Sequence, residues 1–302
     1  MDELRRQHCK LCDVRDFDDP ALLEAIRDVV PERDPRVHVE RKVWEIGMLV
    51  LFLADVDRLN RETRVLAVGA GQERVLFWLA ERVGHLVATD IYGTGPFAAK
   101  EAPATMLTDP ARHAPGPYPQ ERLETRFMDA RALDFPDASF DVAFSLSSFE
   151  HFGGPSDVMR AARELGRVLR PGGHAFIATD CFLRRHPLDS APADFARRVL
   201  TLGRRFSSAT PRRRAALGEV FTPRELQTRI VAPAGLELVQ PLDTRVSPAT
   251  LEGAVRLGPD GEPAPAPGRE YPRVALRAKR SVFTSAALAL RRPDAGESLT
   301  PR

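Results

Sequence analysis

The chain has 302 residues, enough to bury one sizeable domain or two small ones. Hydrophobic residues make up 43% and charged residues 28%, as in ordinary soluble proteins, and a net charge of +2 gives no global reason to expect nucleic acid or a membrane as partner. The three cysteines make no even disulfide framework, the polar start lacks a signal-peptide core, and no apolar run is long enough to span a bilayer. We therefore expect a cytoplasmic protein.

Residues 1–40 form an expected N-terminal cap, with one short helix predicted over residues 20–30 from apolar residues at helical spacing. Cys9 and Cys12 stand at the spacing of half a zinc site, but no second Cys-x-x-Cys pair follows. Plain packing or surface cysteines are favoured over a metal site or a redox dithiol, so we expect no metal.

Residues 37–60 are predicted to form a longer helix, because apolar residues between positions 43 and 54 fall along one face. Arg41, Lys42 and Trp44 stand near its start. They form either a solvated charged turn with the tryptophan in the core, or one wall of a binding site.

Residues 64–92 carry the most informative pattern. An apolar run at 65–68 has the length of a buried parallel strand, and the turn Gly69-Ala70-Gly71 leads from it into a helical pattern. A second apolar run ends in Asp90. Glycines let a ligand approach the backbone, the helix start points unpaired N–H groups at it, and an acid about 20 residues on can accept from ribose hydroxyls. The pattern predicts half of a nucleotide-binding βαβ unit.

Position 74 separates two classes of nucleotide-binding protein. The dinucleotide fingerprint requires Gly or Ala there, and Arg74 disfavours an NAD-dependent oxidoreductase. The segment instead resembles motif I and the following acid motif of class I S-adenosylmethionine-dependent methyltransferases. It departs from that family at Ala67, often an acid, and at Glu73, often a glycine. Glu73 either replaces the missing charge at the methionine end of the cofactor or is an acid favoured by the helix dipole.

The resemblance implies roles for residues on both sides of this unit. Arg41 or Lys42 would pair with the cofactor's carboxylate, and Ile91 would pack on the adenine face. Residues 93–122 have no clear period, and we expect an enlarged loop near the cofactor with one short helix around 97–101.

The third strand is expected at 122–128 and the fourth at 140–145. Residues 129–154 resemble the family's next motifs, which implies that Asp129 accepts from the adenine amino group and that a neighbouring backbone N–H, at Ala130, addresses the ring. Ser145 ends the fourth strand. Ligands of open α/β sheets bind where the strand order reverses, and strands one and four flank that point.

Two residues are candidate bases for the acceptor. His151 has an unperturbed pKa near neutrality, with a structural role as the favoured alternative. Asp180 is expected to leave the fifth strand, predicted at 174–179, on the ligand side. Cys181 is more typical of a small buried side chain than of a nucleophile.

Residues 182–230 hold 11 arginines against 4 acids. We expect residues 182–220 to be an insertion that forms a substrate lid. Arginine clusters suit phosphate or carboxylate, which points to an anionic acceptor, although a solvated arginine-rich face is the favoured alternative. RNA is the less favoured partner because aromatic residues between the arginines are few.

The rest of the chain completes the expected fold. Thr222 and Pro223 begin a helix, a sixth strand is predicted at 236–239, a loop at 243–270 and a last, antiparallel strand at 282–290. The resemblance implies a Rossmann-like, doubly wound α/β fold with a seven-strand mixed sheet over residues 41–292, followed by a tail at 293–302. We expect a methyltransferase that modifies an oxygen or nitrogen of a small molecule, with an RNA methyltransferase and a non-catalytic nucleotide-binding protein as alternatives.

Overall fold

A computed structural model describes residues 4, 6–189, 219–258, 263–264, 270–294 and 296. One mixed sheet runs through this part of the chain, with the strand order β4-β3-β2-β5-β6-β11-β10-β8-β9, and with β1 and β7 paired to β11. The strands are β1 (Lys10–Leu11), β2 (Arg64–Val68), β3 (His85–Asp90), β4 (Leu123–Phe127), β5 (Phe140–Leu146), β6 (Leu169–Arg184), β7 (Glu237–Leu238), β8 (Val255–Leu257), β9 (Pro263–Ala264), β10 (Leu276–Ala278) and β11 (Ser281–Arg291).

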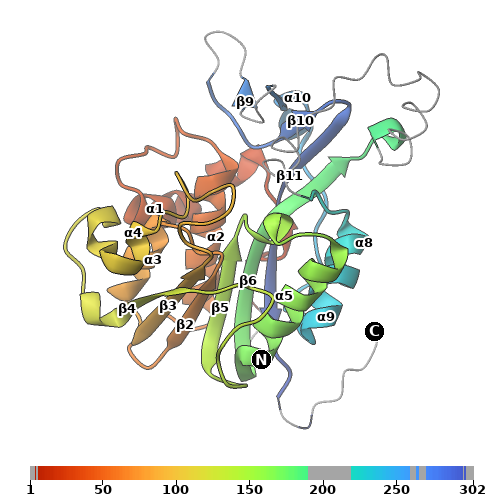
Figure 1. Cartoon of the computed structure of the whole chain (residues 1–302). Coiled ribbons are helices and arrows are strands. Elements are labelled where there is room, and N and C mark those ends of the chain that lie inside the picture. Colours follow the sequence, from red (N-terminus) through yellow and green to blue (C-terminus); the bar gives the residue numbers. More distant parts are fainter. Residues whose placement is uncertain are drawn as a thin grey trace.

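Helices cover both faces of the sheet. Helices α1, α2 and α3 lie on one face, and α5, α8 and α9 lie on the other (Figure 1). The helices are α1 (Pro20–Val29), α2 (Arg41–Asp55), α3 (Arg74–Ala80), α4 (Thr105–Thr108), α5 (Pro155–Val168), α8 (Pro223–Leu226), α9 (Ala232–Ala234) and α10 (Pro248–Glu252). No helix of the described ranges is both long and apolar enough to cross a membrane.

The sheet confirms the predicted fold class. Strands β4, β3, β2, β5 and β6 are parallel, and the last strand, β11, is antiparallel to β6. The strand order reverses between β2 and β5, which is where an open α/β sheet binds its ligand. All seven predicted strands are present, but the count of seven is too low, because β1, β8, β9 and β10 extend the sheet beyond them.

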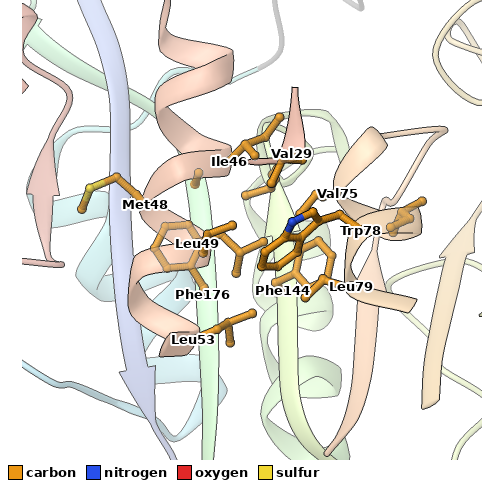
Figure 2. Close-up of a cluster of buried hydrophobic side chains, with 14 of the residues drawn as sticks. Val29, Ile46, Met48, Leu49, Leu53, Val75, Trp78, Leu79, Phe144 and Phe176 are labelled. Carbon is orange, nitrogen blue, oxygen red and sulfur yellow. The ribbon is translucent and has the colours of Figure 1, made fainter. Parts of the chain in front are cut away.

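Helix α2 fills the space between α1 and the sheet. Figure 2 shows Leu49 and Leu53 of α2 beside Phe176 of β6 and Phe144 of β5, with Trp78 of α3 closing the cluster. Burying such side chains contributes roughly 1.5–3 kcal/mol each. The packing fixes α2 against the sheet.

The helix predicted at 37–60 is shorter in the structure. Its start is delayed to Arg41 because Glu40 is extended and forms a bridge with Arg273. At the other end, Asp57 has φ +52°, a left-handed conformation that cannot continue a helix. Arg41 therefore lies in the first turn of α2.

Two local predictions are wrong. The helix expected around 97–101 is a tight turn, in which the N–H groups of Lys100, Glu101 and Ala102 all converge on the carbonyl of Phe97, and α4 follows later at Thr105. The loop expected at 243–270 contains α10 and β8, because residues 255–257 find strand partners in β10 and β9. Most of the expected lid insertion, residues 190–218, lies outside the described residues.

Candidate functional site

The glycine turn after β2 has positive φ angles and packs tightly against two other segments of the chain. Gly69 and Gly71 have φ of +65° and +52°, which L side chains rarely adopt. A Cβ on Gly69 would lie 2.6 Å from Ser148 Cβ, and one on Gly71 would lie 2.7 Å from the carbonyl oxygen of Glu101. Only glycine fits at either position.

Asp90 stands beside this turn at the end of β3. Its carboxylate accepts from the N–H of Gly71 at 2.9 Å and from the N–H of Ile91 at 2.7 Å. Burial raises the pKa of Asp90, while the two N–H donors oppose the rise. The carboxylate is thus fixed against the turn, and its further lone pairs can accept from a ligand.

An apolar surface flanks Asp90. Phe127 of β4 is the strand partner of Asp90 and is 54% exposed, and Ile91 is 38% exposed. Large apolar side chains exposed together often mark a binding surface. A flat ring on these side chains, with a diol on the Asp90 carboxylate, would suit the donors and acceptors present, so the residues fit a nucleoside.

Asp129 and Ala130 follow β4. Arg131 binds the carboxylate of Asp129 through its backbone N–H at 2.9 Å and through its guanidinium. The bonds to Arg131 lower the pKa of Asp129, so the group is ionised at neutral pH. Ala130 is 7% exposed and packs into the core below. A contact of either residue with adenine stays a prediction.

Residues 91–102 cross over the glycine turn, where the sequence led us to expect an enlarged loop, through contacts that the sequence did not reveal. Tyr92 is buried and its hydroxyl donates to the carbonyl oxygen of Gly71 at 2.9 Å. The N–H of Gln72 donates to the carbonyl of Glu101 at 3.0 Å. The ring of Phe97 lies 4.7 Å from that of His151. The segment thereby joins the turn after β2 to the end of β5.

A buried charge cluster lies between α2, β6 and β11. Arg41 forms an ion pair with Asp180 and donates to Ser285 Oγ at 3.3 Å. Glu45, one turn further along α2, lies 3.9 Å from Arg41 and accepts from Ser285 Oγ. The sequence predicted Arg41 and Asp180 as site residues for different reasons, and the structure brings them together.

A hydrogen-bonded path joins this cluster to the glycine turn. Ser147 donates to Glu45, with Oγ 2.8 and 2.7 Å from the two carboxylate oxygens. Its neighbour Ser148 donates to the carbonyl of Gly69 at 2.8 Å. The predicted base Asp180 and the predicted cofactor turn therefore belong to one connected region.

The position of Asp180 differs from the prediction. It does not leave the strand, because β6 continues to Arg184 by pairing with β11. Burial raises the pKa of Asp180 to about 7; Arg41 opposes the rise, while Glu150 and Glu45 add to it and His151 reduces it. A carboxyl with a pKa near neutrality can exchange a proton at physiological pH.

Glu150 is a second buried acid in this region. Thr179 donates to its Oε2 at 2.6 Å, and burial raises the pKa of Glu150. His151, which follows it in a single helical turn, is half-buried. The structure thus places both predicted bases, His151 and Asp180, within the same acidic environment.

Four further residues that the sequence analysis singled out are Lys42, Glu73, Trp44 and Ser145. Lys42 donates to Glu73 at 3.2 Å, so the acid of the turn is paired. Trp44 is fully buried and donates to Asp16 at 2.8 Å, which makes it a core residue rather than a wall of the site. Ser145 is 1% exposed, and its Oγ has no hydrogen-bond partner within the described ranges.

The cysteines are buried thiols. Burial raises the pKa of Cys9 to about 11 and that of Cys181 to about 12, so neither is a ready thiolate. Cys9 donates to the carbonyl of Ala289 at 3.2 Å. The described side chains contain no group of three or more His, Cys, Asp or Glu that could hold a metal ion.

Comparisons with known proteins relate part of the chain to methyltransferases. Residues 66–177 match the family described as "Methyltransferase domain". The chain is 32% identical over 121 residues to 27-O-demethylrifamycin SV methyltransferase of Amycolatopsis mediterranei, covering 40% of each protein. It is 31% identical over 143 residues to phosphatidylethanolamine N-methyltransferase of Cereibacter sphaeroides, covering 47% of this chain and 63% of that protein. The matches thus span about half the length of these curated relatives.

Among solved structures, the YcgJ protein of Bacillus subtilis is similar at 17% identity and a TM-score of 0.46, over 81% of this chain and 97% of that one.

Proposed function

We propose that the protein transfers a methyl group from S-adenosylmethionine to an oxygen or nitrogen of a small molecule, since residues 66–177 match the family described as "Methyltransferase domain". The relatives' names support both acceptor atoms, since one is a 27-O-demethylrifamycin SV methyltransferase and another is an N-methyltransferase. The observation that carries the proposal is the glycine turn at the switch point of the sheet, with Asp90 bonded to its edge.

Different residues around the turn would hold different parts of the cofactor. Asp90 would accept from the ribose hydroxyls, and Ile91 would pack on the adenine with Asp129 and Ala130 at its edge. Gly69, Ala70 and Gly71 would form the turn against which the nucleoside lies, with the space of the two missing side chains taken by Ser148 and the Glu101 carbonyl. Arg41 and Glu73 would orient the methionine end, and Ser145, the residue before the last of β5, would be the contribution of that strand.

S-adenosylmethionine supplies an electrophilic methyl group on a sulfonium. The protein's main contribution is to align the acceptor with that group, and well-oriented reactions reach effective molarities of about 10⁵–10⁸ M. Asp180 would take the proton that the acceptor loses, because its raised pKa matches neutral pH. His151 is the alternative base, since it shares the same acidic surroundings.

The charge of the acceptor is a separate part of the proposal. The arginine-rich residues 182–220 favour an anionic small molecule, and most of them lie outside the described residues. We propose an anionic acceptor on that basis and keep it separate from the reaction type. A panel of paired anionic and neutral hydroxyl or amine compounds tests the charge preference.

The reaction type is tested first by cofactor binding. Calorimetric titration of S-adenosylmethionine and of S-adenosylhomocysteine should show micromolar affinity for both. Asp90→Ala should weaken both affinities roughly tenfold to hundredfold, since hydrogen bonds to a charged group contribute about 1.5–3 kcal/mol. The matched control is Asp134→Ala, at an exposed loop position.

Two outcomes would overturn the proposal. Absence of binding by the folded wild-type protein would favour a non-catalytic protein of the same fold. Equal affinities of wild type and Asp90→Ala would remove the acid from the cofactor site.

A further inference from the structure

Glu45 is a buried carboxylate to which methyl transfer itself assigns no role. It is 0% exposed. Burying an ionised carboxylate is unfavourable unless hydrogen bonds and an opposite charge compensate it. Ser147 and Ser285 donate to it, and Arg41 lies 3.9 Å away while forming its own ion pair with Asp180. Stability alone therefore does not explain why a carboxylate is buried at this position.

The reason is suggested by the backbone of Ser147. This residue has φ +48°, in the left-handed region that non-glycine residues seldom adopt. It directly follows β5, and its N–H donates to the carbonyl of Ala178 at 2.8 Å. The hydroxyl bond to Glu45 is the side-chain contact that favours this conformation over an extended one.

The conformation of Ser147 decides where Ser148 goes. In the observed turn, Ser148 Oγ reaches the carbonyl of Gly69 at 2.8 Å and that of Leu146 at 3.0 Å. The side chain packs so close to Gly69 that no Cβ would fit there. An extended residue at position 147 would move Ser148 away and leave the Gly69 carbonyl without this donor.

We propose that Glu45 is a positioning residue for the glycine turn. Its carboxylate holds Ser147 in the left-handed conformation, Ser147 places Ser148, and Ser148 fixes the Gly69 carbonyl and with it the peptide planes that line the cofactor cradle. The cofactor part of this inference rests on the proposed function, whereas the effect on the turn does not.

Three variants separate this role from simple packing. Glu45→Gln keeps the shape but replaces a charge-assisted bond with a weaker neutral one. Ser147→Ala removes the hydroxyl and keeps a Cβ at positive φ, whereas Ser147→Gly removes the hydroxyl but adopts positive φ freely. Glu24→Gln, at an exposed position of the neighbouring helix α1, is the matched control.

Hydrogen exchange of the ligand-free protein is the primary measurement. Peptides covering residues 69–73 and 146–150 should exchange roughly tenfold faster in Glu45→Gln and Ser147→Ala than in Glu24→Gln, whereas peptides far from the turn should change much less. In parallel, S-adenosylhomocysteine should bind these two variants about tenfold more weakly, the effect of one charged hydrogen bond. Ser147→Gly should recover most of the loss, also when combined with Glu45→Gln.

Unchanged exchange in both Glu45→Gln and Ser147→Ala would overturn the proposal. Equal defects in Ser147→Ala and Ser147→Gly would also overturn it, since the hydroxyl and not the backbone conformation would then matter. If exchange changes as expected while wild type binds no cofactor, the positioning role stands and the proposed methyltransferase function fails.

Discussion

Asp180 of β6 and Ser285 of β11 are direct partners in the antiparallel ladder, and Arg41 of α2 donates to both side chains. The last strand of the sheet and the helix before its first strand therefore meet at the acid proposed as base. Substitution of Asp180 or Arg41 should therefore change both the reaction rate and the stability of the fold. The two effects can be separated by their dependence on pH.

The rate should depend on the protonation of Asp180. With a pKa of about 7, the carboxyl is a proton acceptor only above that pH, so kcat should fall tenfold per unit as the pH drops below about 7. Asp180→Asn should lower kcat by roughly 10²–10⁴-fold and abolish this dependence. The control is Asp134→Asn. If Asp180→Asn keeps both the wild-type rate and the fall of kcat at low pH, the base is His151 instead.

The same group should make stability fall as pH rises. The folded protein holds a proton on Asp180 up to about pH 7, whereas the unfolded chain loses it near 3.8. Between these values the free energy of unfolding should decrease by at most about 1.4 kcal/mol per pH unit. Urea unfolding of wild type and Asp180→Asn at pH 5 and 7.5 isolates this slope as the difference between the two. Parallel curves would show that Asp180 has an ordinary pKa.

Arg41 should matter for folding because it is the cation that Asp180 and Glu45 share. Arg41→Met leaves buried carboxylates uncompensated and should destabilise the protein by about 3–5 kcal/mol, with Arg15→Met at an exposed position as control. Adding Asp180→Asn should restore part of this loss. Additive losses in the double variant, measured by denaturant unfolding, would show that the two residues do not interact.

Gly166 should be intolerant of alanine. A Cβ there would lie 1.8 Å from the carbonyl oxygen of Ala234, where α5 and α9 touch backbone to backbone. Alanine usually stabilises a helix interior by about 0.5–1 kcal/mol, but here overpacking should cost more than its usual 1–3 kcal/mol. The measurement compares the melting temperature of Gly166→Ala with that of Gly116→Ala, where nothing lies within 4 Å of the added Cβ. Equal stabilities would mean that the two helices separate easily.

The sequence predicts the parallel strands and the glycine turn well, because both depend on short-range patterns. The apolar runs at 65–68 and 140–145 reappear as β2 and β5 almost residue for residue. The position of Asp90 beside Gly71 follows from the strand-turn-helix order alone. Such features need no information about the distant parts of the chain.

The charge cluster could not be predicted in the same way. Glu45 interrupts an apolar stretch of α2, which was a signal, but its burial depends on serines 102 and 240 residues further along the chain. The extent of β6 likewise depends on β11, so Asp180 was placed beyond a strand that in fact continues. The sequence left two environments open for Trp44, the core or a wall of the site. Its hydrogen bond to Asp16, which only the folded structure shows, decides for the core.

The arrangement of β11 has a consequence for how the polypeptide reaches its native state. This strand, Ser281–Arg291, pairs with β6, β10, β1 and β7, and Lys10 of β1 is opposite Ala287. A ribosome must therefore synthesise the chain as far as residue 291 before β6 obtains its complete antiparallel partner strand. Contacts of such sequence separation slow folding, so a nascent chain would expose the β6 edge and the acids beneath α2 until β11 emerges.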